Sequence, residues 1–362
     1  MIDEHEVREM LRRRADALPT MPLDTPTAVR RARRRLLVNG VVATVLTVAI
    51  VVAALTGVDA IRSAPIPADR PTPSGIFAPV AGRIVYGDRD GVWGVDPAAP
   101  ADPATSVRLT SEVGIPLGWS SDGTRLLIMR ESPGDRVGFM PAWNLFVLNA
   151  DGSETQVTER PMANLSATIS PDGSRVVFAG GTETPEGECC TRSALYDVDA
   201  DGGPAEVLVE SQMGMVEDPS FSPAGTRIAY LDGSGDHSHS VWLMDADGSG
   251  AHQILSNELT LGVGHAHGLA WSPAGDRIAL GLAGTIYTFA TDGSGFTRVI
   301  TNGDRPYWSP DGSKLAYTIR CLDDPDGCGL AIADADGSNV LTFDFATSGP
   351  WHPGAPTTTG AA

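Results

Sequence analysis

The stretch WSPDGSKLAY, residues 308–317, decides the fold because it recurs along the chain. Related copies read WSSDGTRLLI from residue 119, ISPDGSRVVF from 169, FSPAGTRIAY from 221 and WSPAGDRIAL from 271, and a short copy, WHPG, starts at residue 351. Successive copies begin 37 to 52 residues apart, which is typical of β-propeller blades. In each full copy, a large apolar residue ends one strand, a tight Ser-Gly turn follows, and an apolar run begins the next strand.

A second pattern follows each full copy and predicts two more strands. It reads LFVLNADGSETQVT from residue 145 and returns from residues 195, 241, 286 and 330. Asp-Gly between two apolar runs is a strong signal for a β-hairpin. Each repeat therefore contains four predicted strands, and the chain is predicted to be all-β.

Together, the two patterns resemble the PD40, or WD40-like, repeat of TolB-type β-propellers, in which W-S-P-D-G precedes an apolar strand and D-x-D-G-S. The resemblance covers residues from about 82 to 352. It implies a propeller fold and a role in binding partners at the cell envelope. TolB carries an α/β domain before its propeller, whereas this chain carries a long apolar segment.

Counting the copies predicts a six-bladed β-propeller with four-stranded blades over residues 82–352. Residues 82–111 supply only three strands, so we expect a C-terminal strand from residues 344–352 to complete that blade and close the ring. The other predicted blades span 112–160, 161–212, 213–258, 259–302 and 303–343. The basic residue after each full copy (Arg125, Arg175, Arg227, Arg277 or Lys314) recurs in every repeat, so we expect a structural role for it.

Residues 36–58 are predicted to form one transmembrane helix because these 23 residues contain no charge. Five arginines lie within residues 30–35, and the positive-inside rule places residues 1–35 in the cytoplasm and the propeller outside it. A cleaved signal peptide is the alternative, but its apolar segment would be shorter and nearer the N-terminus. We interpret the proline-rich residues 59–81 as a stalk and residues 353–362 as a disordered tail.

Residues 1–20 have two interpretations. They are a solvated tail, or they form a short amphipathic helix that docks on a cytoplasmic partner. A short segment of this kind before an arginine cluster and one membrane helix is similar to membrane-anchored regulators linked to sigma factors. That resemblance implies a transmembrane sensor.

The formal net charge of −19 argues against nucleic acid as a partner, because phosphate binding needs a basic surface. An acidic surface also keeps an exported protein soluble. Among the four cysteines, Cys321 and Cys328 flank a predicted hairpin loop, and we predict a disulfide between them. Cys189 and Cys190 are adjacent, so they are free or form a strained bridge. The two pairs are too far apart for an all-cysteine zinc site.

Candidate binding residues interrupt the repeat just before three of the copies. Because innermost strands line the channel of a propeller, these residues are expected at its mouth: Glu217, Asp218, His265, His267, Asp304 and Arg305. Alternatively, they only hydrate a water-filled channel. His237 and His239 are expected to be exposed in a connecting loop. The Asp-x-Asp-Gly segments are interpreted as hairpin turns rather than calcium loops, so no metal site and no cofactor are predicted.

The sequence offers little sign of catalysis, because it has no G-x-S-x-G nucleophile elbow and no glycine-rich phosphate loop. We therefore predict a non-catalytic module that binds a protein, a peptide or a cell-wall component. The alternatives are the transmembrane sensor and a metal-dependent hydrolase or lactonase at the channel mouth.

Overall fold

The computed structural model describes residues 75–98, 106–137, 140–159, 162–183, 189–211, 214–233, 239–256, 266–321, 324–343 and 349–353. The chain divides into two units, 1–64 and 65–362, and all the described residues belong to the second. The predicted cytoplasmic tail, transmembrane helix and C-terminal residues 354–362 lie outside the described part. Within that part, no helix has the length and apolar character needed to cross a membrane.

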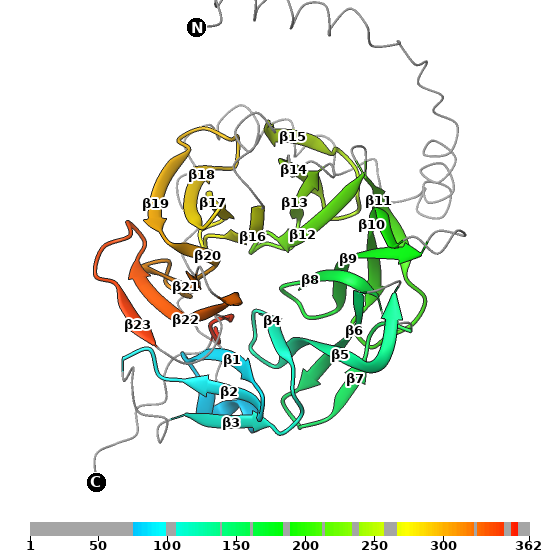
Figure 1. Ribbon diagram of the computed structural model, residues 1–362, viewed down its shortest axis with the longest axis horizontal. Coiled ribbons are helices and arrows are strands. Elements are labelled where there is room, and N and C mark those ends of the chain that lie inside the picture. The colour runs from blue at the N-terminus through cyan, green and yellow to red at the C-terminus, as the bar shows by residue number, and fades with distance from the viewer. Residues whose placement is uncertain are drawn as a thin grey trace, which may run out of the picture. The chain divides into compact units, whose positions relative to one another are not determined.

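Six antiparallel sheets surround a central axis, as Figure 1 shows. Blade 1 contains β1 (Ile84–Asp88), β2 (Gly91–Val95) and β3 (Val107–Thr110), and blade 2 contains β4 (Ile115–Trp119), β5 (Arg125–Val137), β6 (Met140–Asn149) and β7 (Glu154–Gln156). Blade 3 contains β8 (Ala163–Ile169), β9 (Arg175–Glu183), β10 (Cys189–Asp199) and β11 (Glu206–Glu210), and blade 4 contains β12 (Met215–Phe221), β13 (Arg227–Gly233), β14 (His239–Asp245) and β15 (His252–Leu255). Blade 5 contains β16 (Ala266–Trp271), β17 (Arg277–Leu282), β18 (Thr285–Ala290) and β19 (Thr297–Thr301), and blade 6 contains β20 (Gly303–Trp308), β21 (Lys314–Cys321), β22 (Asp324–Asp334) and β23 (Leu341–Phe343). The predicted all-β, six-bladed propeller with four-stranded blades is confirmed.

The C-terminal segment closes blade 1, as predicted. Trp351 forms an antiparallel bridge with Ile84 of β1. The backbone N–H of Val85 donates to the Pro350 carbonyl at 3.1 Å, and the N–H of His352 donates to the Arg83 carbonyl at 2.8 Å. Within the described residues, the closing contact is thus a single β-bridge flanked by two backbone hydrogen bonds. Residues 344–348, the rest of the predicted closing strand, lie outside the described part of the structure.

The repeated Ser-Pro-Asp-Gly turn is held by contacts within its own sequence. At the corner between β20 and β21, the Ser309 hydroxyl accepts the Lys314 N–H at 2.9 Å and donates to Asp311 Oδ1 at 2.7 Å. Asp311 Oδ1 also accepts the Ser313 N–H at 3.0 Å. Gly312 has φ +72°, a left-handed conformation that suits glycine. These contacts explain why this short pattern predicts a strand-turn-strand unit wherever it occurs.

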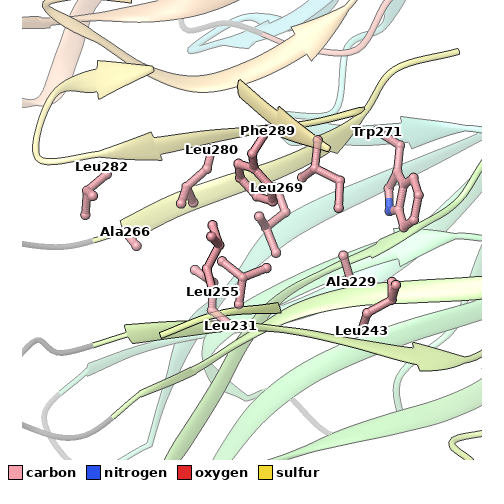
Figure 2. Close-up of a cluster of buried hydrophobic side chains, with 12 residues drawn as sticks. Ala229, Leu231, Leu243, Leu255, Ala266, Leu269, Trp271, Leu280, Leu282 and Phe289 are labelled. Atoms are coloured by element: carbon pink, nitrogen blue, oxygen red, sulfur yellow. The ribbon is translucent and has the colours of Figure 1, made fainter. Parts of the chain in front are cut away.

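Apolar side chains between neighbouring blades hold the ring together. Figure 2 shows one such core between blades 4 and 5, where Leu231 and Leu243 face Leu269, Leu280 and Phe289. Inward-facing positions on adjacent strands supply these side chains, as expected for sheets packed face to face. Each blade is therefore stabilised mainly by its two neighbours, and closure of the ring gives the first and last blades the same support.

The recurring basic residue links neighbouring blades at Arg125 and Arg175, whereas Arg277 and Lys314 bond to Thr288 and Asp334 of their own blades. Arg175 forms a bidentate pair with Asp197 of its own blade, at 3.0 and 2.8 Å, and donates to the Ala246 carbonyl of blade 4 at 3.0 Å. Arg125 of blade 2 lies 2.9 Å from Asp201 of blade 3. These side chains bridge adjacent turns on the face that carries the Ser-Pro-Asp-Gly corners.

The predicted boundary between stalk and propeller needs correction. Residues Gly75–Val80, assigned to the stalk, form a 3-10 helix, η1, in which Phe77 and Val80 are fully buried. They pack in one cluster with Val85, Leu126 and Ile128. The prolines suggested a segment without a core, but apolar residues at positions 77 and 80 bring the end of that segment into blades 1 and 2. The propeller therefore begins near Gly75, before residue 82.

The cysteine predictions remain open. β21 and β22 form the predicted hairpin, but a register shift places Cys321 opposite Asp324. The side chains of Cys321, Cys328, Cys189 and Cys190 lie outside the described part of the structure, so the predicted disulfide stays a prediction.

Candidate functional site

A cavity of about 1330 Å³ runs through the centre of the ring, lined by residues from all six blades. The innermost strands, among them β4, β8, β12, β16 and β20 in Figure 1, all run toward their Ser-Pro-Asp-Gly corners. That end of the cavity is rimmed by the corner prolines Pro171, Pro223, Pro273, Pro310 and Pro353. The two ends of the cavity therefore differ. The corner prolines surround one end, and the innermost strands begin at the other.

Aromatic side chains that end the innermost strands also line the cavity. They are Trp119, Phe221, Trp271, Trp308 and Trp351. The indole N–H of Trp271 donates to the Ser220 carbonyl at 3.0 Å, and that of Trp308 donates to the Ala270 carbonyl at 3.1 Å, so both cross to the preceding blade. The buried indole N–H groups of Trp119 and Trp351 have no hydrogen-bond partner among the described residues. Trp271 and Trp308 thus link neighbouring blades through their indole hydrogen bonds. The five aromatic side chains together give the channel an apolar wall.

Charged side chains gather at the other end of the cavity. Those that line it are Asp88, Arg89, Glu131, Asp218 and Arg305. Asp88, Arg89 and Glu131 were not recognised in the sequence, because their positions relative to the channel depend on where the hairpins of blades 1 and 2 turn.

A β-bulge in the innermost strand turns Asp218 and Arg305 toward the channel. The register shifts between Glu217 and Ser220 in β12, and between Asp304 and Tyr307 in β20. At the bulges, Asp218 and Arg305 both have φ +48°, and Gly268 at the equivalent place in β16 has φ +70°. Bulges commonly redirect a side chain near a functional site.

These bulges also connect the blades. The Asp218 N–H donates to Ser166 Oγ of blade 3 at 2.9 Å, and Asp218 Oδ2 accepts the Gly268 N–H of blade 5 at 2.7 Å. A Cβ atom at Gly268 would lie 2.8 Å from the Arg305 Cα, so the two backbones pass too closely for a larger residue. Blades 3 to 6 are therefore interlocked at the charged end of the cavity.

The six predicted site residues take different places. Asp218 and Arg305 line the cavity. His267 and Asp304 are half-buried outside its lining, and His265 lies outside the described residues. Burial raises the pKa of Asp304, while His267, the Arg305 N–H and the Arg305 guanidinium oppose that rise. The structure thus brings Asp218, His267, Asp304 and Arg305 into electrostatic contact, with two of them facing the channel.

Glu217 turns away from the channel, toward β14. Its Oε2 lies 3.8 Å from Nε2 of His239. Burial, with a smaller contribution from Asp218, raises the pKa of Glu217 to about 7. The expectation that His239 is exposed in a loop is wrong, because it begins β14 and is 4% exposed. The polar sequence around it suggested a loop, but the hairpin strand extends into it; His237 lies outside the described residues.

The described residues contain no group of three or more His, Cys, Asp or Glu side chains arranged to hold a metal ion. The cavity lining within that part also lacks His, Cys and Lys. These are the side chains that most often act as nucleophile or base, besides serine and carboxylates. Serine and carboxylate side chains do line the cavity.

No family model matches the chain, and no curated protein matches it. Among solved structures, TolB from Acinetobacter baumannii is 16% identical, with a TM-score of 0.56 over 77% of this chain and 67% of TolB. The fold is that of a TolB-type β-propeller. A putative TolB from Agrobacterium tumefaciens is 24% identical over 65% of this chain and 81% of its own, with a TM-score of 0.49. An oligogalacturonate lyase in complex with manganese is 15% identical over 76% of each chain, with a TM-score of 0.47.

The likeness to TolB confirms the fold that the repeat implied. At these identities it concerns the fold alone, because unrelated functions occur on the same propeller. The function of this TolB-like propeller has to be argued from its own channel.

Proposed function

We propose that this protein is a membrane-anchored module that binds a protein or peptide in the channel of its propeller, outside the cytoplasm. The single observation that carries the proposal is the central cavity of about 1330 Å³, with an aromatic wall and charged groups at one end. Binding sites typically combine a concave apolar surface with a few polar groups that fix orientation. A cavity of this size takes a short peptide segment.

The apolar residues 36–58 and the arginines before them support the membrane-anchored part of the proposal. The test is to express the full chain with a C-terminal tag and to fractionate the cells. We expect the tagged protein to stay with membranes after an alkaline wash, and protease added outside intact spheroplasts to remove the tag. A tag that is protected from protease, or a protein released by the alkaline wash, would contradict the anchor.

Two exposed valines provide a matched test of binding in the channel. Val113 is 55% exposed and lines the cavity, whereas Val207 is 48% exposed on the outermost strand β11. A photo-crosslinking amino acid at position 113 of the full-length protein should capture a specific partner in cells, and the same residue at position 207 should not. Equal capture at both positions, or none at 113, would remove the channel as the binding site.

A second candidate function, signalling across the membrane, rests on the pattern of residues 1–20 beside the arginine cluster. In this case the tail 1–35 holds a cytoplasmic regulator while the propeller senses a ligand. A pull-down from cytoplasm with the tail peptide tests it, with a peptide of the same composition in scrambled order as the control. Recovery of the same proteins by both peptides would count against signalling.

A further inference from the structure

A second cavity, of about 490 Å³, lies between the corners of blades 5 and 6. It is lined by Thr288 and by residues of the segments 272–277, 297–299, 308–312 and 335–336, and we call it the 5–6 groove. Pro273 and Trp308 line both this groove and the central cavity, so the two spaces adjoin at the proline rim. A ligand that leaves the channel at this point therefore meets the groove next.

The equivalent place between blades 2 and 3 is occupied by an arginine of the protein itself. The guanidinium of Arg125 donates to the Gly173 carbonyl, in the corner of blade 3, at 3.0 Å. Its other terminal nitrogen lies 2.9 Å from Oδ1 of Asp201, in the hairpin of the same blade. A corner carbonyl and a hairpin carboxylate of one blade thus form a site that fits the fork of a guanidinium.

In the 5–6 groove, the same two acceptors are present. Gly312 of the blade 6 corner stands in the place of Gly173, and Asp336 of the blade 6 hairpin stands in the place of Asp201. Both Gly312 and Asp336 line the groove. Asp336 accepts the Ser338 N–H at 2.9 Å, and across the described part of the chain no basic side chain forms an ion pair with it.

The arginine that would fill this groove is held back in its own blade. Arg277 is the residue equivalent to Arg125, and its Nη2 donates to Thr288 Oγ1 at 2.6 Å. The strand register places Val147 of blade 2 where blade 5 has Thr288. A valine accepts no hydrogen bond, so Arg125 reaches across to blade 3, whereas the hydroxyl of Thr288 keeps Arg277 from doing the same.

The charge of the groove favours a cation. Within its described lining, Asp276, Asp311 and Asp336 face the single guanidinium of Arg277. Hydrogen bonds from the side chain and the N–H of Ser338 hold the pKa of Asp336 below its ordinary value, so this carboxylate is ionised at neutral pH. The groove therefore retains uncompensated negative charge beside an apolar wall.

We propose that the 5–6 groove binds an arginine side chain of the peptide that occupies the channel. This inference rests on the proposed peptide-binding function and names one residue of the ligand. The guanidinium donates to the Gly312 carbonyl and to the Asp336 carboxylate, in the arrangement that blade 3 shows. Its aliphatic stem packs against Val299 and Trp308, which line the groove. Two acceptors on separate groups suit the two terminal nitrogens of arginine better than the compact ammonium of lysine.

The test uses the full-length protein in detergent and an array of short peptides that join an apolar segment to one arginine. Each peptide is also made with citrulline, which has nearly the shape of arginine but no charge. We expect a subset of the arginine peptides to bind, and their citrulline forms to bind at least about tenfold more weakly, since a charge-assisted contact is lost.

Asp336→Asn should weaken the binding of the arginine peptides to the level of the citrulline forms. The amide oxygen still accepts the Ser338 N–H, so the hairpin is kept. Asp292→Asn is the matched control, because Asp292 holds the same place in the hairpin of blade 5, accepts the Ser294 N–H at 2.9 Å and lies outside the linings of both cavities. This control should leave binding unchanged.

Thr288→Val tests the groove without removing a charge. It should release Arg277 to reach Asp336, as Arg125 reaches Asp201, and so weaken the arginine peptides to the citrulline level. Thr288→Ser keeps the hydroxyl and should bind as the wild type does. Both weakened variants should retain the residual binding of the citrulline forms, which reports that the channel is intact.

Loss of the arginine preference in Asp336→Asn or in Thr288→Val, and not in the matching control, supports the groove as the site. Retention of the full preference in both variants would overturn it. Equal binding of arginine and citrulline peptides to the wild-type protein would overturn it too but would leave peptide binding intact. Binding of no peptide would remove both proposals.

Discussion

Ser309 and His352 occupy the same place in successive repeats, directly after the tryptophan, but contacts of different range hold their two corners. Ser309 bonds to Asp311 and Lys314, all within six residues. The imidazole of His352 lies 3.2 Å (Nε2) from the Gly123 carbonyl, and its ring centre is 4.5 Å from that of Trp119. The repeated corner is thus specified locally, whereas the closing corner depends on residues more than two hundred positions away in the sequence.

This difference indicates where the stability of the ring is concentrated. A repeat architecture distributes stability over neighbour contacts, so loss of one local corner weakens one blade. The closing contacts, among η1, the start of β5 and the C-terminal segment, are the ones that join the two ends of the array. Changes there should cost more than changes in a repeated corner.

The largest effect is expected from Phe77→Ala. Phe77 is fully buried, and its ring centre lies 4.7 Å from that of Trp119 and 6.4 Å from that of His352. Removal of a buried phenylalanine side chain lowers the free energy of unfolding by about 3–5 kcal/mol. Denaturant unfolding of the purified protein measures this loss. Phe296→Ala is the control, because Phe296 is only partly buried beside Tyr287; an equal loss in both variants would show that closure carries no special weight.

The second effect is a pH dependence at the same corner. Burial lowers the pKa of His352 from 6.5 to about 4, and the Gly123 carbonyl and Asp122 only partly oppose this. Between these values the unfolded chain binds a proton that the folded chain does not. The His352 contribution to the free energy of unfolding should therefore fall by roughly 3 kcal/mol as the pH drops from 6.5 to 4, while the raised pKa of Glu217 contributes a change of the opposite sign between about pH 7 and 4.5.

Two histidine variants check that assignment. Relative to the wild type, His352→Gln should make the free energy of unfolding fall less, or rise, as the pH drops from 6.5 to 4, because it removes the group whose protonation destabilises the fold and leaves Glu217 to titrate. His252→Gln, at an exposed position on β15, should leave the dependence as in the wild type. If both variants keep the full dependence, another group is responsible for acid sensitivity.

The third effect compares two tryptophans. Trp271→Phe removes the hydrogen bond to the half-buried Ser220 carbonyl, which costs about 1 kcal/mol beyond the change in ring size. Trp351→Phe removes an indole N–H that has no partner among the described residues, so this additional loss is not expected. Unfolding midpoints of the two variants give the difference. A cost for Trp351→Phe that equals or exceeds that of Trp271→Phe would mean that its N–H is satisfied in solution.

The same contrast explains how much the sequence could predict. The corner at Ser309 is built from residues within one short motif, so its pattern predicts strands, blades and their number. Closure followed from the missing strand of blade 1. The burial of Phe77 did not follow, because its partners come from blade 2 and the C-terminal segment, and the prolines around it pointed to a stalk.

The candidate site was predictable to a similar degree. The residues before the repeated motif were expected at the channel, and Asp218 and Arg305 line it. Glu217 and Asp304 are adjacent to them in sequence but turn aside, because a bulge decides which side chain faces inward. Bulges depend on contacts between blades about fifty residues apart, such as that from Asp218 to Ser166, and a single repeat does not reveal them.

The smallest effect is expected in a repeated corner. Asp172 accepts hydrogen bonds from Ser170 and Ser174, and these lower its pKa to about 2. Its carboxylate therefore stabilises the corner above pH 3.8, and this contribution is lost as the pH falls toward 2. Asp172 is exposed, so water replaces these contacts, and Asp172→Ala should cost less than about 1 kcal/mol at pH 7.

Two corners of the same protein already carry alanine at this place, at Ala224 and Ala274, and both keep the backbone hydrogen bond that closes the turn. The reverse change, Ala224→Asp, should therefore stabilise blade 4 by a similar small amount, and a pair of unfolding curves at pH 7 measures both changes. If Asp172→Ala destabilised the protein as much as Phe77→Ala, the stability of the ring would depend on each local corner as much as on the contacts that close it.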